Sequence, residues 1–151
     1  MTLKQISVFL ENSPGRLLEV ATAFGDAGIN LKALSLTGSS GFGVLRLIVS
    51  DLQQARTIAM EHRWPARVDE VVAVRIADDP GSLAKLLAPL YEQRVDVEYM
   101  YSISELSVAE AVMIFGFKET GEAVNVLQNC SAVLLSGAEF GALGSEGNQA
   151  R

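Results

Sequence analysis

Cysteine and histidine are almost absent from this chain, which contains one of each, Cys130 and His62. A single cysteine cannot form an internal disulfide, and its use agrees with a reducing compartment. Metal sites built from His and Cys need several such ligands close together, and the carboxylates are scattered along the chain. We therefore expect neither a metal site nor a bound cofactor.

Long apolar runs and an excess of basic residues are also missing. No apolar stretch approaches the roughly 20 residues of a membrane-spanning helix, and the start, MTLKQISVFLEN, lacks a basic segment followed by a small-residue cleavage site. The net charge of −6 disfavours a general nucleic-acid binder, whose affinity rests on clustered Lys and Arg. We expect a cytoplasmic protein with neither a membrane nor a nucleic acid as partner.

Candidate catalytic groups do not gather into a constellation. His62 lies beside an expected helix end, where a solvated or capping role is the simpler interpretation, and Cys130 is more often a buried small side chain than a nucleophile. Glu98, Tyr99 and Tyr101 form the most distinctive group, and for the two tyrosines, on one strand face, we favour sheet-interface packing over stacking on a ligand. The sequence therefore predicts no enzyme.

What the chain does contain is ample core material and an internal repeat. Its 151 residues suit one ordinary domain or two small ones, and 49% of them are hydrophobic. The segment ENSPGRLLEVATAFGDAGINL (11–31) returns, with Pro80 aligned on Pro14, as ADDPGSLAKLLAPLYEQRVDV (77–97). The same offset aligns the strand-like residues Ile6, Val8 and Leu10 with Val72, Val74 and Ile76. Such self-similarity indicates two copies of one supersecondary unit.

Within each copy, the spacing of apolar residues changes between the strand and the helix period, in the order strand, helix, strand, strand, helix, strand. Residues at alternate positions of 6–10 predict a strand, whereas the spacing of Leu17, Val20, Ala21 and Phe24 predicts a helix face. Asp51 is the expected N-cap of a helix that continues to about His62. In the second copy we expect a helix near 120–129 and a last strand near 132–136. The segment ARVDEVVAVRIA (66–77) must supply both the last strand of the first copy and the first strand of the second.

This order predicts an α+β fold of two ferredoxin-like βαββαβ units, each with an antiparallel sheet covered on one face by two helices. We expect one domain over residues 1–70, a second over 71–140 and a flexible tail over 141–151. The strand around 44–49 is apolar on both faces apart from Arg46, so its second face is either covered by a partner or half exposed. Pro89 predicts a kink or a shortened helix.

The Pro-Gly pairs are expected where a helix begins, because proline at the first helical position loses no intrahelical bond. Gly15 and Gly81 then leave the helix N–H groups uncovered, and these groups suit an anion such as the carboxylate of a small molecule. The alternative is a strand-to-helix turn without a ligand.

The segment ENSPGRL, with GINL at the second strand, resembles the ACT domain, a small ligand-sensing module of this βαββαβ order. The resemblance extends over both copies, about residues 3–70 and 71–140. It implies a free-standing tandem ACT protein, with its two units paired side by side, that binds an amino acid at the domain interface and acts as an allosteric regulator. It also implies a homodimer and a metabolic enzyme as a partner. The alternative is a ligand-free interaction module that docks on such an enzyme.

In serine-sensing ACT domains the ligand contacts an Asn two residues before the Pro-Gly and an Asn that opens the second strand. Asn12 and Asn30 occupy these positions, whereas the second copy carries Asp78 and Asp96. Asp78 and its neighbour Asp79 are expected to cap their own helix and to repel a carboxylate. Asp96 is expected to face the first loop and to receive the ligand's ammonium. The resemblance thus implies this ligand-binding set: Asn12, Ser13, Pro14, Gly15, Arg16, Asn30, Leu31 and Asp96.

Overall fold

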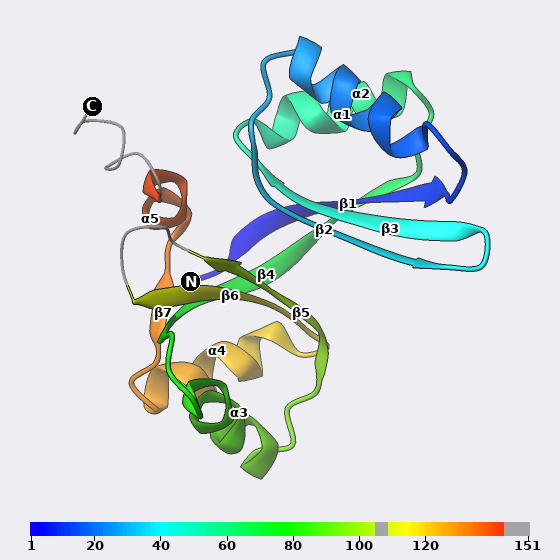
Figure 1. Ribbon diagram of the computed structural model, residues 1–151. Helices are drawn as coiled ribbons and strands as arrows, with labels where there is room; N and C mark the ends of the chain where they lie inside the picture. Colours follow the sequence, from blue (N-terminus) through cyan, green and yellow to red (C-terminus); the bar gives the residue numbers. More distant parts are fainter. Residues whose placement is uncertain (105–108, 144–151) are drawn as a thin grey trace. The chain divides into compact units, whose positions relative to one another are not determined.

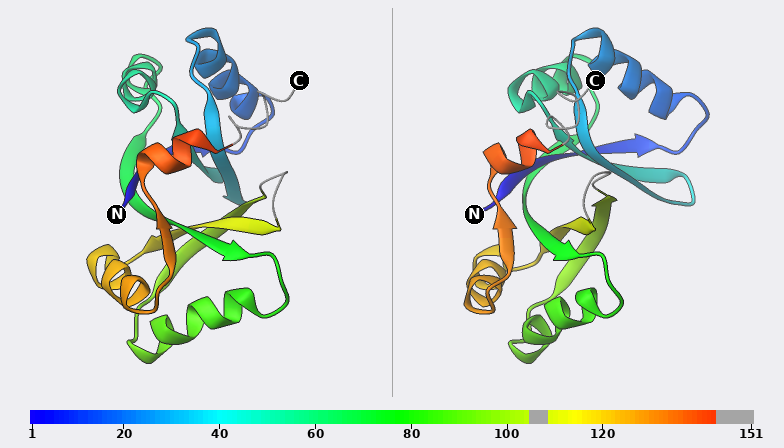
Figure 2. Two further views of the ribbon diagram at one scale, coloured as in Figure 1. Left: turned by 90° about the vertical axis from the view of Figure 1, so that its left-hand side faces the viewer. Right: turned by 60° about the vertical axis from the view of Figure 1, so that its left-hand side comes forward.

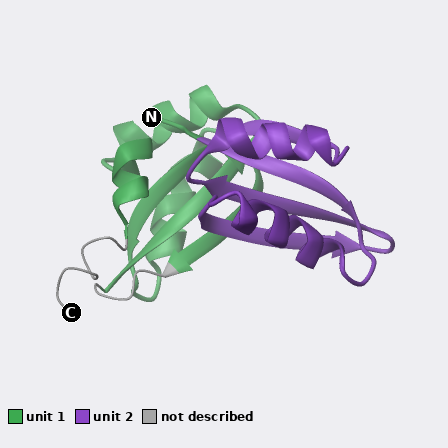
Figure 3. Ribbon diagram, turned by 90° about the horizontal axis from the view of Figure 1, so that it is seen from above, with its two compact units in different colours: residues 1–3, 70–151 green, residues 4–69 purple. Residues whose placement is uncertain are grey.

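The computed structural model describes residues 1–104 and 109–143, which form two compact units. The amino-terminal unit contains residues 4–69, and the carboxy-terminal unit contains residues 1–3 with those from residue 70 onward (Figure 3). None of the described helices is long and apolar enough to cross a membrane.

The amino-terminal unit is a four-stranded sheet with two helices on one face (Figure 1). Its strands follow the order β2-β3-β1-β4, and β3 is antiparallel to both β1 and β2. The elements are β1 (Leu3–Glu11), α1 (Arg16–Asp26), β2 (Leu31–Ser39), β3 (Phe42–Val49), α2 (Leu52–Glu61) and the first part of β4 (Ala66–Ala77).

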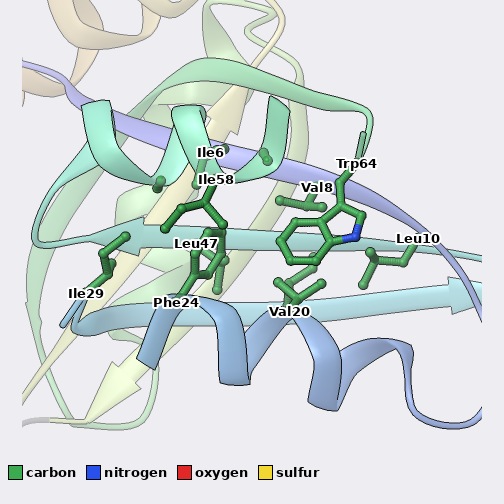
Figure 4. Packing of buried hydrophobic residues seen from close by; sticks show 12 residues of the cluster. Ile6, Val8, Leu10, Val20, Phe24, Ile29, Leu47, Ile58 and Trp64 are labelled. Atoms are coloured by element: carbon green, nitrogen blue, oxygen red, sulfur yellow. The ribbon is translucent and has the colours of Figure 1, made fainter. Parts of the chain in front are cut away.

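The core of this unit lies between its sheet and its helices. Ile6 and Val8 from β1 face Phe24 and Val20 from α1, and all four are at most 1% exposed (Figure 4). Trp64, which follows α2, lies edge-on to Phe24 with 6.0 Å between the ring centroids. The predicted strand face is confirmed, because Ile6, Val8 and Leu10 are all buried. The predicted face of α1 is correct at Val20 and Phe24 but wrong at Leu17 and Ala21, which are exposed. Ala23 and Ala27 pack against the core in their place.

The carboxy-terminal unit repeats this order, and Figure 2 shows its helices from two further sides. Its strands follow the order β5-β6-β4-β7, and each neighbouring pair is antiparallel. The elements after the second part of β4 are α3 (Ser82–Glu92), β5 (Val97–Ser104), β6 (Glu110–Phe117), α4 (Thr120–Asn129), β7 (Val133–Leu135) and α5 (Gly137–Ala142). The predicted α+β class with two βαββαβ units is confirmed, and the single strand β4 serves both units as expected.

Two features of the carboxy-terminal unit differ from expectation. Helix α3 continues past Pro89 to Glu92 and has 11 residues, as many as α1. Of the two predicted effects of Pro89, the shortened helix is therefore wrong, and the kink stays a prediction. The proline removes the bond to the carbonyl of Lys85, an exposed residue that water can reach. Helix α5 was not predicted, although it contains Gly141 and Ala142 of the expected tail and buries Phe140. Residues 144–151 of that tail lie outside the described residues.

The second face of β3 is neither fully covered nor uniformly exposed. On the face away from the helices, Phe42 is 69% exposed, Val44 is half-buried and Ile48 is 6% exposed. Exposure thus decreases along the strand. The expectation of an exposed face therefore describes the end of β3 at Phe42, and the expectation of a covered face describes the end at Ile48.

Candidate functional site

The loop between β1 and α1 is held by backbone hydrogen bonds. The N–H of Asn12 donates to the Gly41 carbonyl at 3.0 Å, and the N–H of Arg16 donates to the Ser13 carbonyl at 3.3 Å. Gly15 is the N-cap of α1 with φ 89°, a left-handed conformation that favours glycine. Pro14 therefore precedes the N-cap and is not the first helical residue, which corrects the expected position of both prolines.

The same loop geometry recurs between β4 and α3. Asp78 N–H donates to the Ala109 carbonyl at 2.9 Å, and Gly81 caps α3 with φ 85°. Neither α1 nor α3 has a side-chain hydrogen bond at its N-cap. The prediction that Asp78 and Asp79 cap their helix is therefore wrong: the Asp79 backbone carbonyl accepts from Ser82 N–H, and the left-handed glycine removes the geometry that a capping carboxylate needs.

Polar side chains surround the mouth of α1. The side-chain amide of Asn12 lies against Gly38 of β2, 3.5 Å from where a Cβ on that glycine would be. Arg16 pairs with Glu19 at 3.2 Å and with Glu11 at 3.8 Å. The Arg16 N–H is thus already bonded, and its guanidinium already has two carboxylate partners. The groups of this loop that suit a further carboxylate are the other N–H groups of the first helical turn and the Asn12 amide.

Asn30 and Leu31 lie at the other end of the sheet. Asn30 N–H donates to Ser50 Oγ at 2.9 Å, and Ser50 N–H donates to the Asn30 carbonyl at 3.0 Å. Leu31 pairs with Val49 and packs against the core. Glu11, beside Asn12, instead pairs with Phe42 at the opposite end of β3. One unit therefore does not bring Asn12 and Asn30 together.

Asp96 occupies the place of Asn30 in the carboxy-terminal unit. Its carbonyl accepts from Lys118 N–H at 3.4 Å, as that of Asn30 accepts from Ser50. Its side chain is exposed. The pairing of Asp96 with the Asn12 loop stays a prediction.

The other candidate residues divide into packed and exposed groups. His62 stacks on Trp64, with ring centroids 4.4 Å apart. Cys130 is exposed and its thiol donates to the Val126 carbonyl, so the expectation that it is buried is wrong. Tyr99 and Tyr101 are half-buried on the sheet face away from the helices, as Gly116 and Ile114, their partners on β6, show. Within residues 1–104 and 109–143, no group of three metal-ligating side chains is present.

Sequence reasoning missed the contribution of the β2–β3 hairpin to the first loop. Gly38 leaves space for the Asn12 amide, and Gly41 supplies the carbonyl that holds the Asn12 backbone. The cluster of glycines in LTGSSGFG (36–43) was a usable signal, but a turn alone explains such glycines equally well.

The repeated βαββαβ order agrees with the comparisons to known proteins. A family described as the ACT domain pair matches residues 1–135, and the chain belongs to that family. It is similar to protein BT0572 from Bacteroides thetaiotaomicron, with 34% identity, 93% of this chain and 96% of the other covered, and a TM-score of 0.86.

More distant solved structures share the fold. The ligand-free regulatory subunit of aspartate kinase from Thermus thermophilus is 16% identical, with 83% of this chain and 90% of that chain covered and a TM-score of 0.60. A structure of aspartokinase alpha and beta subunits is 20% identical over 83% and 90% of the two chains, with a TM-score of 0.58. No curated protein matches the chain.

Proposed function

We propose that this ACT domain pair is a regulatory protein without catalytic activity that binds a free amino acid. The observation that supports this most strongly is the mouth of α1, where Gly15 leaves the helix N–H groups uncapped beside Asn12 and Arg16. In this proposal those N–H groups and the Asn12 amide receive the ligand's carboxylate. Ser13 and Pro14 shape the loop that presents them.

The amino-terminal loop is the better carboxylate receptor of the two. Asp78 and Asp79 bring two negative charges to the equivalent loop before α3, where no side chain caps the helix. The acids at the first loop, Glu11 and Glu19, are balanced by Arg16, whereas Asp78 and Asp79 have no ion-pair partner in the described part of the chain. The two aspartates therefore repel the carboxylate of an incoming ligand. The second loop is therefore a weak site or none.

The ligand's ammonium needs acceptors that this loop does not offer, because its nearest carboxylates, Glu11 and Glu19, are paired with Arg16. Asn30 and Leu31 lie at the opposite end of the same sheet, so a complete site needs a second ACT unit. We propose that Asp96, or Asn30 of another copy, supplies this half after side-by-side pairing. Among the described strands, β2 and β5 end the order β2-β3-β1-β4-β6-β5, and their outer edges suit such pairing, within a chain or in a homodimer.

Regulation in this proposal is a shift of population. A ligand between two ACT units favours one relative arrangement, by no more than its difference in affinity for the two. Two proteins of the same fold are described as the regulatory subunit of aspartate kinase and as aspartokinase alpha and beta subunits. They support the proposal that this chain acts on a metabolic enzyme.

A thermal-shift screen against the twenty amino acids tests the proposal. A ligand that binds the native state adds RT ln(1 + [L]/Kd), about 2.7 kcal/mol at a hundredfold excess over Kd. One or a few amino acids should raise the melting temperature of the natural protein, and Asn12→Ala should abolish the rise. Asp96→Asn should abolish it if Asp96 supplies the second half of the site and should leave it intact if Asn30 does. Asp78→Ala is the matched control and should leave it intact.

Two outcomes contradict the proposal. No response to any amino acid would favour the alternative, a module that docks on an enzyme without a small ligand. A response that survives Asn12→Ala but is lost in Asp78→Ala would place the ligand at the second loop.

A further inference from the structure

A groove on the helical face of the amino-terminal unit lies outside the proposed amino-acid site except for Gly15. It runs between α1 and α2 and has a volume of about 700 Å³. Its lining follows one face of α1 from Gly15 to Ala27, a distance of about 18 Å at 1.5 Å per residue. That length accommodates about three turns of another helix, which far exceeds the size of one amino acid.

The floor and the rim of this α1–α2 groove differ in chemistry. The floor is apolar and includes Ala23, Ala27 and Ile58, while Leu18 on the rim is 70% exposed. The acidic lining residues are Glu19, Asp26 and Glu61, and none of the described residues that line the groove is Lys or Arg. An apolar floor with an acidic rim complements an amphipathic helix that carries basic residues beside its apolar face.

Two of these acidic residues occupy positions that oppose helix stability. Asp26 is the last residue of α1 and Glu61 is the last residue of α2, and neither helix has a basic residue in its last turn. The negative end of the helix dipole disfavours a carboxylate at this position. Cationic side chains of a partner would offset this cost at Asp26 and Glu61.

The acidic residues of the α1–α2 groove are only partly repeated in the described part of the carboxy-terminal unit. At the offset that aligns Pro14 with Pro80, Lys85 replaces Glu19 and Ala84 replaces Leu18, whereas Glu92 keeps the acid of Asp26. Where Glu61 ends α2, Asn129 ends α4. The two units share a fold, so these differences do not follow from it. The complete acidic rim and the exposed leucine are thus particular to the first copy.

We infer that the α1–α2 groove binds a basic amphipathic helix of a partner protein. The partner's apolar residues, spaced i, i+3, i+4 and i+7, pack on Leu18, Ala23 and Ile58, and its Lys or Arg side chains pair with Asp26 and Glu61. A second copy is a poor occupant, because each copy carries a net charge of −6 and would bring further negative charge to an acidic rim.

The single tryptophan provides a reporter for this groove. His62 lines the groove and stacks on Trp64, which is 8% exposed. A helix that fills the groove covers His62 and changes the polarity beside the indole. Trp64 emission therefore reports binding in this groove.

The experiment titrates the full chain with a labelled three-turn peptide that has leucines at i, i+3, i+4 and i+7, lysines at its flanks and no tryptophan. Peptide anisotropy and Trp64 emission should report one binding curve. Raising the ionic strength from about 0.1 M to about 1 M, which shortens the screening length from about 10 to about 3 Å, should weaken binding. The same peptide with Glu in place of Lys should not bind.

Variants then locate the site. The double variant Asp26→Asn, Glu61→Gln should weaken peptide binding roughly three- to tenfold, because it loses the exposed ion pairs with the peptide. It should also raise the melting temperature, because it removes two carboxylates from the negative ends of the helix dipoles. Glu92→Gln, the matched control at the end of α3, should raise the melting temperature without changing affinity. Asn12→Ala should leave peptide binding unchanged, which separates this inference from the proposed amino-acid site.

Several results overturn the inference: no binding of the lysine peptide, equal binding of the glutamate peptide, binding without a change in Trp64 emission, or equal weakening by Glu92→Gln. Self-association of the chain that quenches or shifts Trp64 emission and is lost in the double variant would instead identify a second copy as the occupant.

Discussion

The ring of Tyr99 lies directly over Gly116 on the neighbouring strand, so close that a Cβ on residue 116 would overlap the ring. The corresponding pair in the amino-terminal unit is Ala33 and Ile48, which are also register partners. The large residue thus stands on β5 in one unit and on β3 in the other. In both units one large and one small residue face each other at this contact, but the strand that carries the large one differs.

Gly116→Ala should therefore destabilise the carboxy-terminal unit. Because the added methyl group displaces the Tyr99 ring, we expect a loss of about 1–3 kcal/mol in the free energy of unfolding. In a Tyr99→Ala background the same substitution should be neutral or stabilising. A double-mutant cycle by denaturant unfolding measures the coupling, and additive effects of the two substitutions would contradict the proposed contact.

Gly15 is required for its backbone conformation and not for lack of space. Its φ is 89°, and a Cβ there would have no atom within 4 Å. Gly15→Ala should cost about 1 kcal/mol through backbone strain alone, and Gly15→Asn should cost less because asparagine tolerates left-handed conformations. Denaturant unfolding of both variants checks this, with Gly81→Ala as the equivalent in the other unit. An equal cost for alanine and asparagine would show that some other contact matters.

Asp51 and Glu119 occupy equivalent N-cap positions, before α2 and α4, but only Asp51 caps its helix with its side chain. Asp51 accepts a hydrogen bond from Gln54 N–H at 3.0 Å, whereas Glu119, with a similar backbone conformation, makes no side-chain capping bond. Asp51→Ala should cost about 1 kcal/mol and Glu119→Ala less than about 0.5 kcal/mol. Glu119→Asp should stabilise, because the shorter side chain reaches the helix N–H groups. Thermal unfolding of the three variants tests the comparison, and a neutral Asp51→Ala would refute it.

The sequence predicts the features that depend on local pattern. The spacing of apolar residues defines the strands and helices of both units, and Asp51 signals the start of α2 without any tertiary information. The repeat then predicts that one strand, β4, serves both units. These predictions are sound because side-chain periodicity and capping depend on neighbours within a few residues.

The features that the sequence does not predict depend on contacts between residues far apart in the chain. Asn12 is held by Gly41 and lies against Gly38, some 30 residues further along the chain, and this loop leaves Gly15 as the cap and moves Pro14 outside the helix. The groove between α1 and α2 likewise depends on how two helices pack, which no single helix reveals.

The capping box of α5 should make stability depend on pH at the acidic end. The N–H of Glu139 donates to Ser136 Oγ, and the N–H of Ser136 donates to Glu139 Oε1, both at 3.2 Å. Hydrogen bonds from the Ser136 side chain and then its backbone lower the pKa of Glu139 below its ordinary 4.5, and Arg75 contributes a smaller attraction. A lowered pKa means that the folded state favours the ionised carboxylate.

The stabilisation is therefore fully present above about pH 4.5, the value for the unfolded chain, and is lost as the pH falls through the lowered pKa of the folded state. Glu139→Gln should lower the melting temperature near neutral pH, and its difference from the natural protein should shrink toward about pH 3 as Glu139 becomes protonated. Ser136→Ala removes the hydroxyl and should reduce the same pH dependence. A difference between the natural protein and Glu139→Gln that stays constant down to about pH 3 would show that the ionised carboxylate contributes nothing through this cap.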